Sequence, residues 1–362
     1  MKRYYMEQKK KILLHDQRYT IGGPKAVLDG IENSYLGKKY EFVRITQTTA
    51  CGFNPIKAWK EIMQCKKQID KQHADCIYIC GFEYPGLLMT IASKLSNVKR
   101  IVLSCHGSAW DTPDGTLRKF ILKYIIEPIQ VYLADAVITV CEAAQHSVGA
   151  IRIACHGNNE GVVYNTFPNK ILEDYDSFAL RKEFGISLDK IVVTSVGRVV
   201  EAKGHAYTIQ AIKELNDSRY VFCVVGDGPY LEEYRKQCAN EIKEGKIILL
   251  GQRSDVFQIL RSSDIYLFST LNENHSIALL EAVNMKCCAL CTNVGGNPEI
   301  IEDGVSGIVI PRKDPSAIVE GLKTLADKNL RYQYAERAYE ICKEKFSVEN
   351  TYGKLEKVLI NL

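Results

Sequence analysis

The sequence lacks several features that would each indicate a particular class of protein. No apolar run approaches the roughly 20 residues that a membrane-spanning helix needs. The stretch "MKRYYMEQKKKILLH" has no long apolar segment before a small-residue cleavage site, so it does not resemble a secretory signal. No repeat of roughly 20 to 50 residues and no low-complexity tract is visible. These absences lead us to expect a cytoplasmic protein.

Paired cysteines at regular spacings are also missing. The 13 cysteines are odd in number and irregularly spaced, and most stand in apolar runs such as "CIYIC" and "MKCCALCT". The cluster Cys287, Cys288 and Cys291 has no second ligand pair at zinc-finger spacing. We therefore expect buried, reduced thiols and no metal site.

The chain has enough apolar residues for two ordinary domains, because it has 362 residues of which 46% are hydrophobic. Its net charge of +4 is unevenly distributed: residues 1–165 have 22 Lys+Arg against 15 Asp+Glu, and the remainder has 25 against 28. The basic half could meet anionic lipid, a phosphate-bearing substrate or nucleic acid, or it could be an ordinary solvated surface.

Short β-branched apolar runs alternate with longer amphipathic stretches in both halves, which indicates parallel sheets covered by helices. The polar segment 166–189 has no strand signal and separates the halves. We therefore expect an α/β protein of two doubly wound domains, 1–165 and 166–345, with a terminal helix at 346–362. The expected strands are "KILLHD", "EFVRIT", "CIYICG", "RIVLSCHG", "DAVITV" and "GVVYN", then "KIVVTSVG", "YVFCVVGDG", "KIILLGQ", "DIYLFS", "CCALCT" and "SGIVIP".

Ligands of open α/β sheets bind beyond the carboxyl ends of the strands, so the loops there are the candidate sites. In "SVGRVVEAKGH" a strand is followed by Arg198 and Lys203, two cations that suit a diphosphate but could also be surface charges. "VVGDGPY" adds Gly226 and Gly228, which permit either close approach to a ligand or a tight turn.

Two glutamates flank the start of a predicted helix in "STLNENHSIALLEAVNMK". The backbone N–H groups of Ser276, Ile277 and Ala278 would form an anion site between Glu273 and Glu281. The two carboxylates would lie roughly 12 Å apart along a helix, a distance that suits a nucleotide sugar. Alternatively, Glu273 is favoured near the helix start by the macrodipole, and Glu281 is one polar position on a partly exposed helix.

The Glu-x7-Glu spacing, together with "GRVVEAKG", "VVGDGP", "VGGNPEIIEDGVSGIVIP" and the early "GGPKAVLDGI", resembles the retaining GT-B glycosyltransferases of family 4, the glycosyl transferases group 1. The resemblance runs from about Lys11 to the carboxyl terminus. It implies an amino-terminal acceptor domain and a carboxyl-terminal nucleotide-sugar domain that face a central cleft, with the terminal helix packed back toward the amino-terminal domain.

The resemblance also implies roles for single residues. Arg198 and Lys203 would bind the diphosphate, Glu273 the donor sugar near the reacting carbon, and Glu281 the ribose. Gly22 and Gly23 would form a glycine loop over the donor. His106 in "SCHGSAW" matches the family's histidine beside the donor sugar and the acceptor, although by position alone it could be a structural hydrogen-bonding residue.

Some residues depart from the family pattern or have a simpler explanation. The family often has glycine and a bulky residue after the first glutamate, whereas Asn274, His275 and Ser276 follow Glu273, which leaves the sugar open. For His15 and His275 we expect local loop bonding. The Asp-x-Asp string at 174–176 lies in the linker, so we interpret it as solvated charge.

The expected reaction is metal-independent, front-face transfer of a hexose-type sugar from a UDP-sugar to a glycan or lipid-linked acceptor in surface polysaccharide biosynthesis. No cofactor is expected, since the nucleotide sugar is a substrate, and no nucleic-acid partner. The alternatives are another GT-B enzyme such as a sugar-nucleotide epimerase, or a noncatalytic nucleotide-sugar-binding subunit.

One segment bears on the acceptor. "LRKFILKYIIEPIQVYL", residues 117–133, mixes basic and apolar residues and contains Pro128, which could kink a helix. It is either a core-facing helix, which we favour, or a helix that touches the inner face of a membrane. Trp110 could stack on a sugar or anchor its loop.

Overall fold

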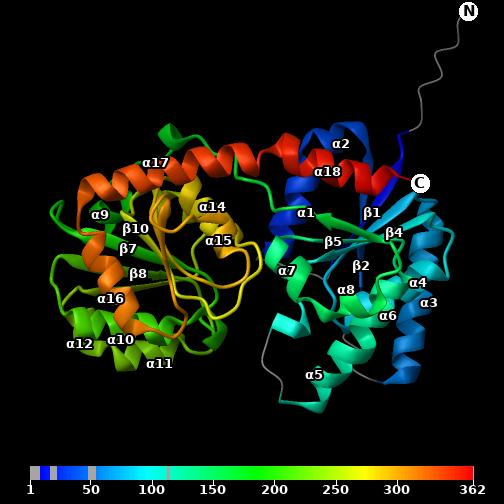
Figure 1. Cartoon of the computed structure of the whole chain (residues 1–362), viewed down its shortest axis with the longest axis horizontal. Helices are drawn as coiled ribbons and strands as arrows, with labels where there is room; N and C mark the ends of the chain where they lie inside the picture. The colour runs from blue at the N-terminus through cyan, green and yellow to red at the C-terminus, as the bar shows by residue number, and fades with distance from the viewer. Residues whose placement is uncertain (1–8, 17–22, 48–53, 112–114, 362) are drawn as a thin grey trace, which may run out of the picture. The chain divides into compact units, whose positions relative to one another are not determined.

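The computed structural model describes residues 9–16, 23–47, 54–111 and 115–361. The chain divides into two compact units. Unit 1 comprises residues 1–166 and 348–362, and unit 2 comprises residues 167–347. Each unit is a parallel β-sheet with helices on both faces (Figure 1).

The sheet of unit 1 has the strand order β2-β1-β3-β4-β5-β6, and all of its strand pairs are parallel. Its strands are β1 (Lys11–Asp16), β2 (Glu41–Thr46), β3 (Cys76–Cys80), β4 (Arg100–Cys105), β5 (Ala136–Thr139) and β6 (Asn159–Val162). Its helices are α1 (Gly23–Asn33), α2 (Tyr35–Lys39), α3 (Pro55–Gln72), α4 (Tyr84–Lys94), α5 (Leu117–Ile121), α6 (Glu127–Leu133), α7 (Glu142–Ser147), α8 (Gly149–Ala154) and α18 (Val348–Ile360), with the 3-10 turn η1 (Ala109–Asp111) and the π-helical turn η2 (Leu122–Ile126).

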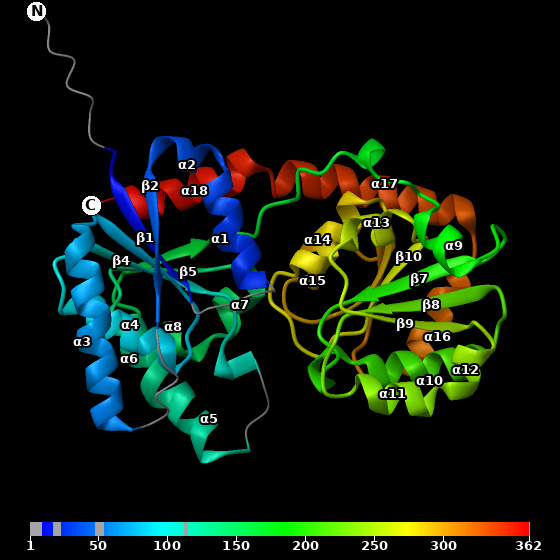
Figure 2. The ribbon, with the colours of Figure 1, turned by 180° about the vertical axis from the view of Figure 1, so that it is seen from behind.

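Alternate side chains of these strands enter two different cores, as the two-residue period of a strand requires. Leu13 of β1 packs in the core formed with α3, α4, α6 and α8. Its neighbours Ile12 and Leu14 point to the opposite face, where α1, α2 and α18 supply the apolar partners. Figure 2, which views the molecule from behind, shows α18 running along this face near α1 and α2. The segment 348–360 therefore belongs to the core of unit 1 although it is distant in sequence.

The sheet of unit 2 has the order β12-β11-β10-β7-β8-β9, again wholly parallel. Its strands are β7 (Ile191–Val196), β8 (Tyr220–Val225), β9 (Ile247–Gly251), β10 (Ile265–Phe268), β11 (Cys288–Thr292) and β12 (Gly307–Ile310). Its helices are α9 (Ala179–Phe184), α10 (His205–Leu215), α11 (Leu231–Gln237), α12 (Ala239–Lys243), α13 (Val256–Arg261), α14 (Ile277–Asn284), α15 (Asn297–Ile300), α16 (Pro315–Thr324) and α17 (Lys328–Lys345), with the 3-10 turns η3 (Leu172–Asp174) and η4 (Glu201–Lys203). In Figure 1, α10, α11, α12 and α16 lie below the sheet, and α14 and α17 lie above it.

The predicted fold class is confirmed, because every predicted strand segment overlaps a strand of the structure. The poorest match is "GVVYN", since β6 begins two residues earlier and ends at Val162. The cysteines of the described residues form no disulfide with one another, and all but Cys155 are buried. Cys51 lies outside the described residues.

The strand orders locate one topological switch point in each sheet. In unit 2 the order reverses between β7 and β10, which pair directly through Ile265 and Val193. In unit 1 it reverses between β1 and β3. Doubly wound sheets bind ligands at the carboxyl ends of the strands at such points, where the connections diverge to opposite faces. The loops after β7 and β10 are therefore the preferred binding place of unit 2.

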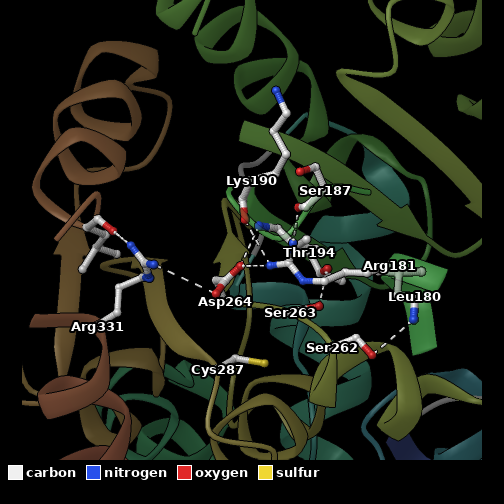
Figure 3. Close-up of polar contacts among 12 residues, drawn as sticks. Leu180, Arg181, Ser187, Lys190, Thr194, Ser262, Ser263, Asp264, Cys287 and Arg331 are labelled. Carbon is white, nitrogen blue, oxygen red and sulfur yellow. Dashed lines mark hydrogen bonds and ion pairs between the residues drawn. The ribbon is translucent and has the colours of Figure 1, made fainter. Parts of the chain in front are cut away.

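The opposite, amino-terminal edge of this sheet is held by Asp264, as Figure 3 shows. Asp264 Oδ2 accepts hydrogen bonds from the Val192 N–H at 2.8 Å and from the Arg181 guanidinium at 2.7 Å. Arg331 Nη2 lies 4.0 Å from Asp264 Oδ1. One carboxylate thus joins α9, β7 and the helix α17 to the start of β10.

We expect Asp264→Ala to lower the free energy of unfolding by about 2–3 kcal/mol, because it removes the acceptor of two partly buried hydrogen bonds and leaves Arg181 without its carboxylate. Urea unfolding followed by circular dichroism measures the change. The matched control is Glu320→Ala, which breaks an exposed ion pair with Lys323 and should cost under about 0.5 kcal/mol. Equal losses in both variants would contradict the structural role of Asp264.

Candidate functional site

The loops after β7 and β10 in unit 2 lie in close contact with neighbouring backbone, which is possible because two of the contacting residues are glycines. A Cβ atom on Gly204 would lie 2.0 Å from the Ser269 carbonyl oxygen, and one on Gly295 would lie 1.7 Å from the Glu273 carbonyl oxygen. Both glycines have positive φ angles, 68° and 51°, which other L residues rarely adopt. The segment from Ser269 to Glu273 is therefore pressed between backbone on both sides, which fixes the position of Glu273.

Two of the predicted site residues form an ion pair across these loops. Lys203 Nζ lies 2.7 Å from Glu273 Oε2, and each side chain is 21% exposed. The Lys203 ammonium also lies over the Phe268 ring, 5.1 Å from its centroid. The two charges were predicted from separate motifs, and the topology brings them together because β7 and β10 are adjacent strands.

Arg198 lies in the same β7 loop with its side chain exposed. Its guanidinium forms no hydrogen bond or ion pair with the part of the chain that the structure describes. The preceding residue, Gly197, has a φ of 153°, and a Cβ there would contact the Lys203 side chain. The loop thus holds an exposed cation and a paired one close together in the chain.

The amino terminus of α14 lies directly after the Glu273 loop. Ser276 is the N-cap, and its Oγ accepts the Leu279 N–H at 3.2 Å. Helix geometry leaves the N–H groups of Ile277 and Ala278 without partners inside the helix, and both residues are partly exposed. Of the three residues predicted for an anion site, Ile277 and Ala278 therefore have N–H groups that the helix leaves available, and Ser276 is the buried N-cap.

Glu281 follows one turn later, on the same helix face as Ile277. It is partly buried, and burial raises its pKa to about 7 against the opposing charge of Lys170. Burial, and then the charges of Glu281 and Glu273, hold the pKa of the fully buried Tyr266 well above its usual value. Both glutamates therefore lie close enough to one β10 ring to influence its ionisation.

His106 belongs to unit 1, where it follows β4. Its Nε2 lies 3.0 Å from Ser104 Oγ and 3.4 Å from Tyr78 Oη. Burial lowers the pKa of His106 to about 4, so the ring is neutral at pH 7. A neutral imidazole can donate or accept a proton but adds no positive charge. Of the glycine pair, Gly23 begins α1 and Gly22 lies outside the described residues.

His15 is buried within strand β1 and not in a loop, so the expectation of loop bonding was wrong for it. His275 is buried with its ring 4.7 Å from that of Phe346. Asp176 accepts the Phe178 N–H and the Lys182 ammonium, which makes it a local structural residue.

Trp110 anchors its loop. Its ring lies 5.1 Å from that of Tyr124, and a Cβ on Gly149 would lie 2.5 Å from it.

One acidic residue of unit 1 was missed by the sequence interpretation. Glu127 is 2% exposed and accepts hydrogen bonds from the loop just after His106. Its signal was a single carboxylate in the apolar run "YIIEPI", which a core helix would not tolerate without partners. Among the described residues, no three His, Cys, Asp or Glu side chains come together as a group that could hold a metal ion.

Comparison with known proteins gives matches over both units. The family model described as "Glycosyl transferases group 1" matches residues 176–341, and the model "Glycosyl transferase 4-like" matches residues 28–140. A similar curated protein is the UDP-Gal:alpha-D-GlcNAc-diphosphoundecaprenol alpha-1,3-galactosyltransferase of Escherichia coli, 23% identical over 85% of this chain and 80% of that protein. The capsular polysaccharide biosynthesis glycosyltransferase CapM of Staphylococcus aureus is 24% identical over 84% of this chain and 82% of its own length.

Solved structures agree with the fold. The crystal structure of Anabaena HepE in complex with UDP and glucose matches with a TM-score of 0.78 at 20% identity, over 98% of this chain and 100% of that one. At this identity the match establishes the fold, GT-B, and not the substrate. Together with the two family models, it shows that the chain belongs to the group 1 family of GT-B glycosyltransferases.

Proposed function

We propose that this chain transfers a hexose-type sugar from a UDP-sugar to a glycan or lipid-linked acceptor in surface polysaccharide biosynthesis, with retention of configuration and without a metal ion. The observation that carries the proposal is the Lys203–Glu273 pair at the carboxyl ends of β7 and β10, with Arg198 and Glu281 on the same two connections. The names of the relatives support the substrate class, since one is named for UDP-Gal and another for capsular polysaccharide biosynthesis.

The residues of unit 2 would share the donor between them. Arg198, Lys203 and the N–H groups of Ile277 and Ala278 would neutralise the diphosphate, which is the charge that a metal ion neutralises in other enzymes. A diphosphate that draws Lys203 away would free Glu273 to accept sugar hydroxyls near the reacting carbon. Glu281 would accept the ribose hydroxyls, and its ionised form would be favoured by these donors.

His106 of unit 1 would act on the reacting sugar and the acceptor. Because its ring is neutral at pH 7, it would hydrogen-bond a sugar hydroxyl without repelling the positive charge that develops on the sugar ring. In a front-face transfer, the acceptor hydroxyl would attack from the side of the leaving diphosphate. The acceptor proton would pass to the departing phosphate oxygen, so no separate base is needed.

The first test separates binding from transfer. Glu281→Gln should weaken UDP binding by about 10- to 100-fold, because the amide replaces a charged acceptor of the ribose hydroxyls. His106→Ala should bind UDP within about twofold of the parent yet transfer far more slowly, since it is placed at the reacting sugar. Calorimetric titration with UDP, and assays of a panel of UDP-sugars with and without EDTA, measure both effects. EDTA should leave turnover unchanged.

The pH dependence of the free energy of unfolding shows whether the Glu281→Gln variant is folded as the parent is. The pKa of Glu281 is raised in the folded protein, so its favourable contribution to stability is present below about pH 4.5 and is lost as pH rises through about 7. The glutamine has no such dependence, so the variant should be at least as stable as the parent at pH 8. A stable variant that binds UDP as tightly as the parent would contradict the placement of the ribose. A parent that binds UDP-sugars but never turns them over would favour a noncatalytic subunit.

The lipid-linked acceptor is supported by an exposed apolar surface on unit 1. The segment 117–133 faces the core on one side, as we favoured, with Ile126 and Val131 buried, but its other side is also apolar and is exposed. Its large side chains that are more than 40% exposed are Leu117, Phe120, Tyr124, Ile125, Ile129 and Tyr132. Within this segment the π-helical turn η2 joins the Glu127 N–H to the Leu122 carbonyl oxygen, five residues back.

A second apolar face lies at the start of α3. Ile56, Trp59 and Met63 are 81%, 58% and 42% exposed at helical spacing. The start of α3 and α5 both lie at the lower end of unit 1 in Figures 1 and 2. Exposed basic residues accompany both, Lys57 and Arg118 among them, whereas Lys123 is buried and cannot reach a lipid surface. No helix among the described residues is long and apolar enough to cross a membrane. We therefore propose contact of this end with an anionic membrane surface, at the inner face of the cytoplasmic membrane.

Sedimentation with vesicles of phosphatidylglycerol and phosphatidylcholine tests this contact. Phe120→Ser combined with Tyr124→Ser should weaken binding at any salt concentration, because apolar area is lost. Arg118→Glu should weaken it about fivefold or more at low salt and little at high salt. Tyr332→Ser in unit 2, where the parent tyrosine is 67% exposed, is the control and should bind normally. If the parent protein stays in the supernatant, the proposed membrane contact is contradicted, and a glycan acceptor that is not linked to lipid is the remaining proposal.

A further inference from the structure

Helix α6 of unit 1 contacts the loops after two neighbouring strands through two buried polar side chains. Gln130 Nε2 donates to the Gly81 carbonyl oxygen at 3.0 Å, just after β3. One turn earlier, Glu127 contacts the loop after β4: Oε1 accepts the Ala109 N–H at 2.7 Å, and Oε2 accepts the Ser108 hydroxyl at 2.7 Å. An amide is sufficient at the first loop, whereas the second is held by a carboxylate that uses both of its oxygens.

The loop held by Glu127 is the one that carries His106. Ser108 Oγ also accepts the Trp110 N–H at 3.1 Å, and the Ser108 N–H donates to Asp111 Oδ2 at 2.8 Å. Only Gly107 separates His106 from Ser108. On the other side of His106, β4 is fixed by its pairing with β3 and β5. A shift of Ser108 must therefore be absorbed by His106 and Gly107.

We infer that Glu127 is a positioning residue for His106, which fixes the loop after His106 through two charge-assisted hydrogen bonds. The inference rests on the proposed role of His106 in transfer. Charged acceptors bind roughly twice as strongly as neutral ones, so the ionised carboxylate holds the loop more firmly than an uncharged group of the same shape. Glu127 touches no reacting atom in this scheme; it acts through the loop.

The ionisation of Glu127 then affects turnover near neutral pH. Burial raises the pKa of Glu127 to about 7, the bonds from Ala109 and Ser108 oppose this, Asp111 on η1 raises it further, and Lys123 on η2 lowers it. The protonated carboxyl has one fewer acceptor site and becomes a donor, much like a glutamine. Transfer should therefore slow as the pH falls through about 7, and a glutamine at this position should show the slower rate at all pH values.

The test compares Glu127→Gln with Glu61→Gln, a matched control. Glu61 on α3 is equally buried, 2% exposed, and lies 3.8 Å from Cys65 Sγ on its own helix. Two measurements are made on the full chain between pH 6 and pH 8.5. The first is NMR of the Ala109 amide and of the His106 ring, which needs no turnover. The second is kcat and KM for release of UDP from UDP-glucose and UDP-galactose, with UDP affinity measured by calorimetry.

We expect the Ala109 and His106 signals of the parent to shift together with a midpoint near pH 7, and this step to vanish in Glu127→Gln but persist in Glu61→Gln. At pH 8, kcat of Glu127→Gln should fall about 10-fold with KM and UDP affinity within twofold, and the gap should narrow at pH 6. Ser108→Ala should also lower kcat, and combining it with Glu127→Gln should add little, because both changes weaken the same hydrogen bond between Ser108 and Glu127.

His106 ring signals that are identical in the parent and in Glu127→Gln over the whole pH range would overturn the inference. So would an equal loss of kcat in Glu61→Gln. If the parent releases no UDP from any donor, the proposed function fails, and the NMR comparison alone decides whether Glu127 positions the His106 ring.

Discussion

The close contact of backbone with backbone around the segment from Ser269 to Glu273 is the constraint on which the candidate site of unit 2 depends. Gly204 lies against the Ser269 carbonyl group and Gly295 against that of Glu273, each at a distance that excludes any side chain. A loop held in this way has little freedom to relax, so the backbone position of Glu273 is fixed before any ligand binds. Preorganised charge of this kind is more effective in catalysis than charge that must be rearranged during the reaction.

The two edges of the same sheet differ in how their charged side chains are paired. At the amino-terminal edge, Asp264 and Arg181 bind each other and nearby backbone, so their hydrogen bonds stabilise the fold. At the carboxyl-terminal edge, Arg198 is exposed, and Lys203 forms an ion pair with the Glu273 carboxylate. Parallel strands create this difference, because all of their connections of one kind leave from the same edge.

Unit 1 uses buried polar side chains in a different way. Gln130 and Glu127, one turn apart on α6, each reach the loop of a neighbouring strand, whereas the outer face of the same segment is apolar. Buried carboxylates are costly unless every acceptor is used, and Glu127 uses both of its oxygens. Burial also explains why the His106 ring is neutral, because it removes the water that would stabilise the charged form of the ring.

Much of the architecture could be predicted from the sequence, because the signals for strands and helices are local. Apolar runs of strand length predicted the strands of both sheets, and the order of motifs from about Lys11 onward indicated the family, because each signal depends on neighbours within a few residues. The pairing of Lys203 with Glu273 could not be predicted in this way. It depends on the adjacency of β7 and β10, whose paired positions Val193 and Ile265 are 72 residues apart in the sequence and are brought together by the strand order of the sheet. The contacts of Glu127 and the burial of Lys123 could not be predicted either. A helix that is apolar on two faces does not indicate from its sequence which face meets the core. That face is decided only by packing against α4 and α8.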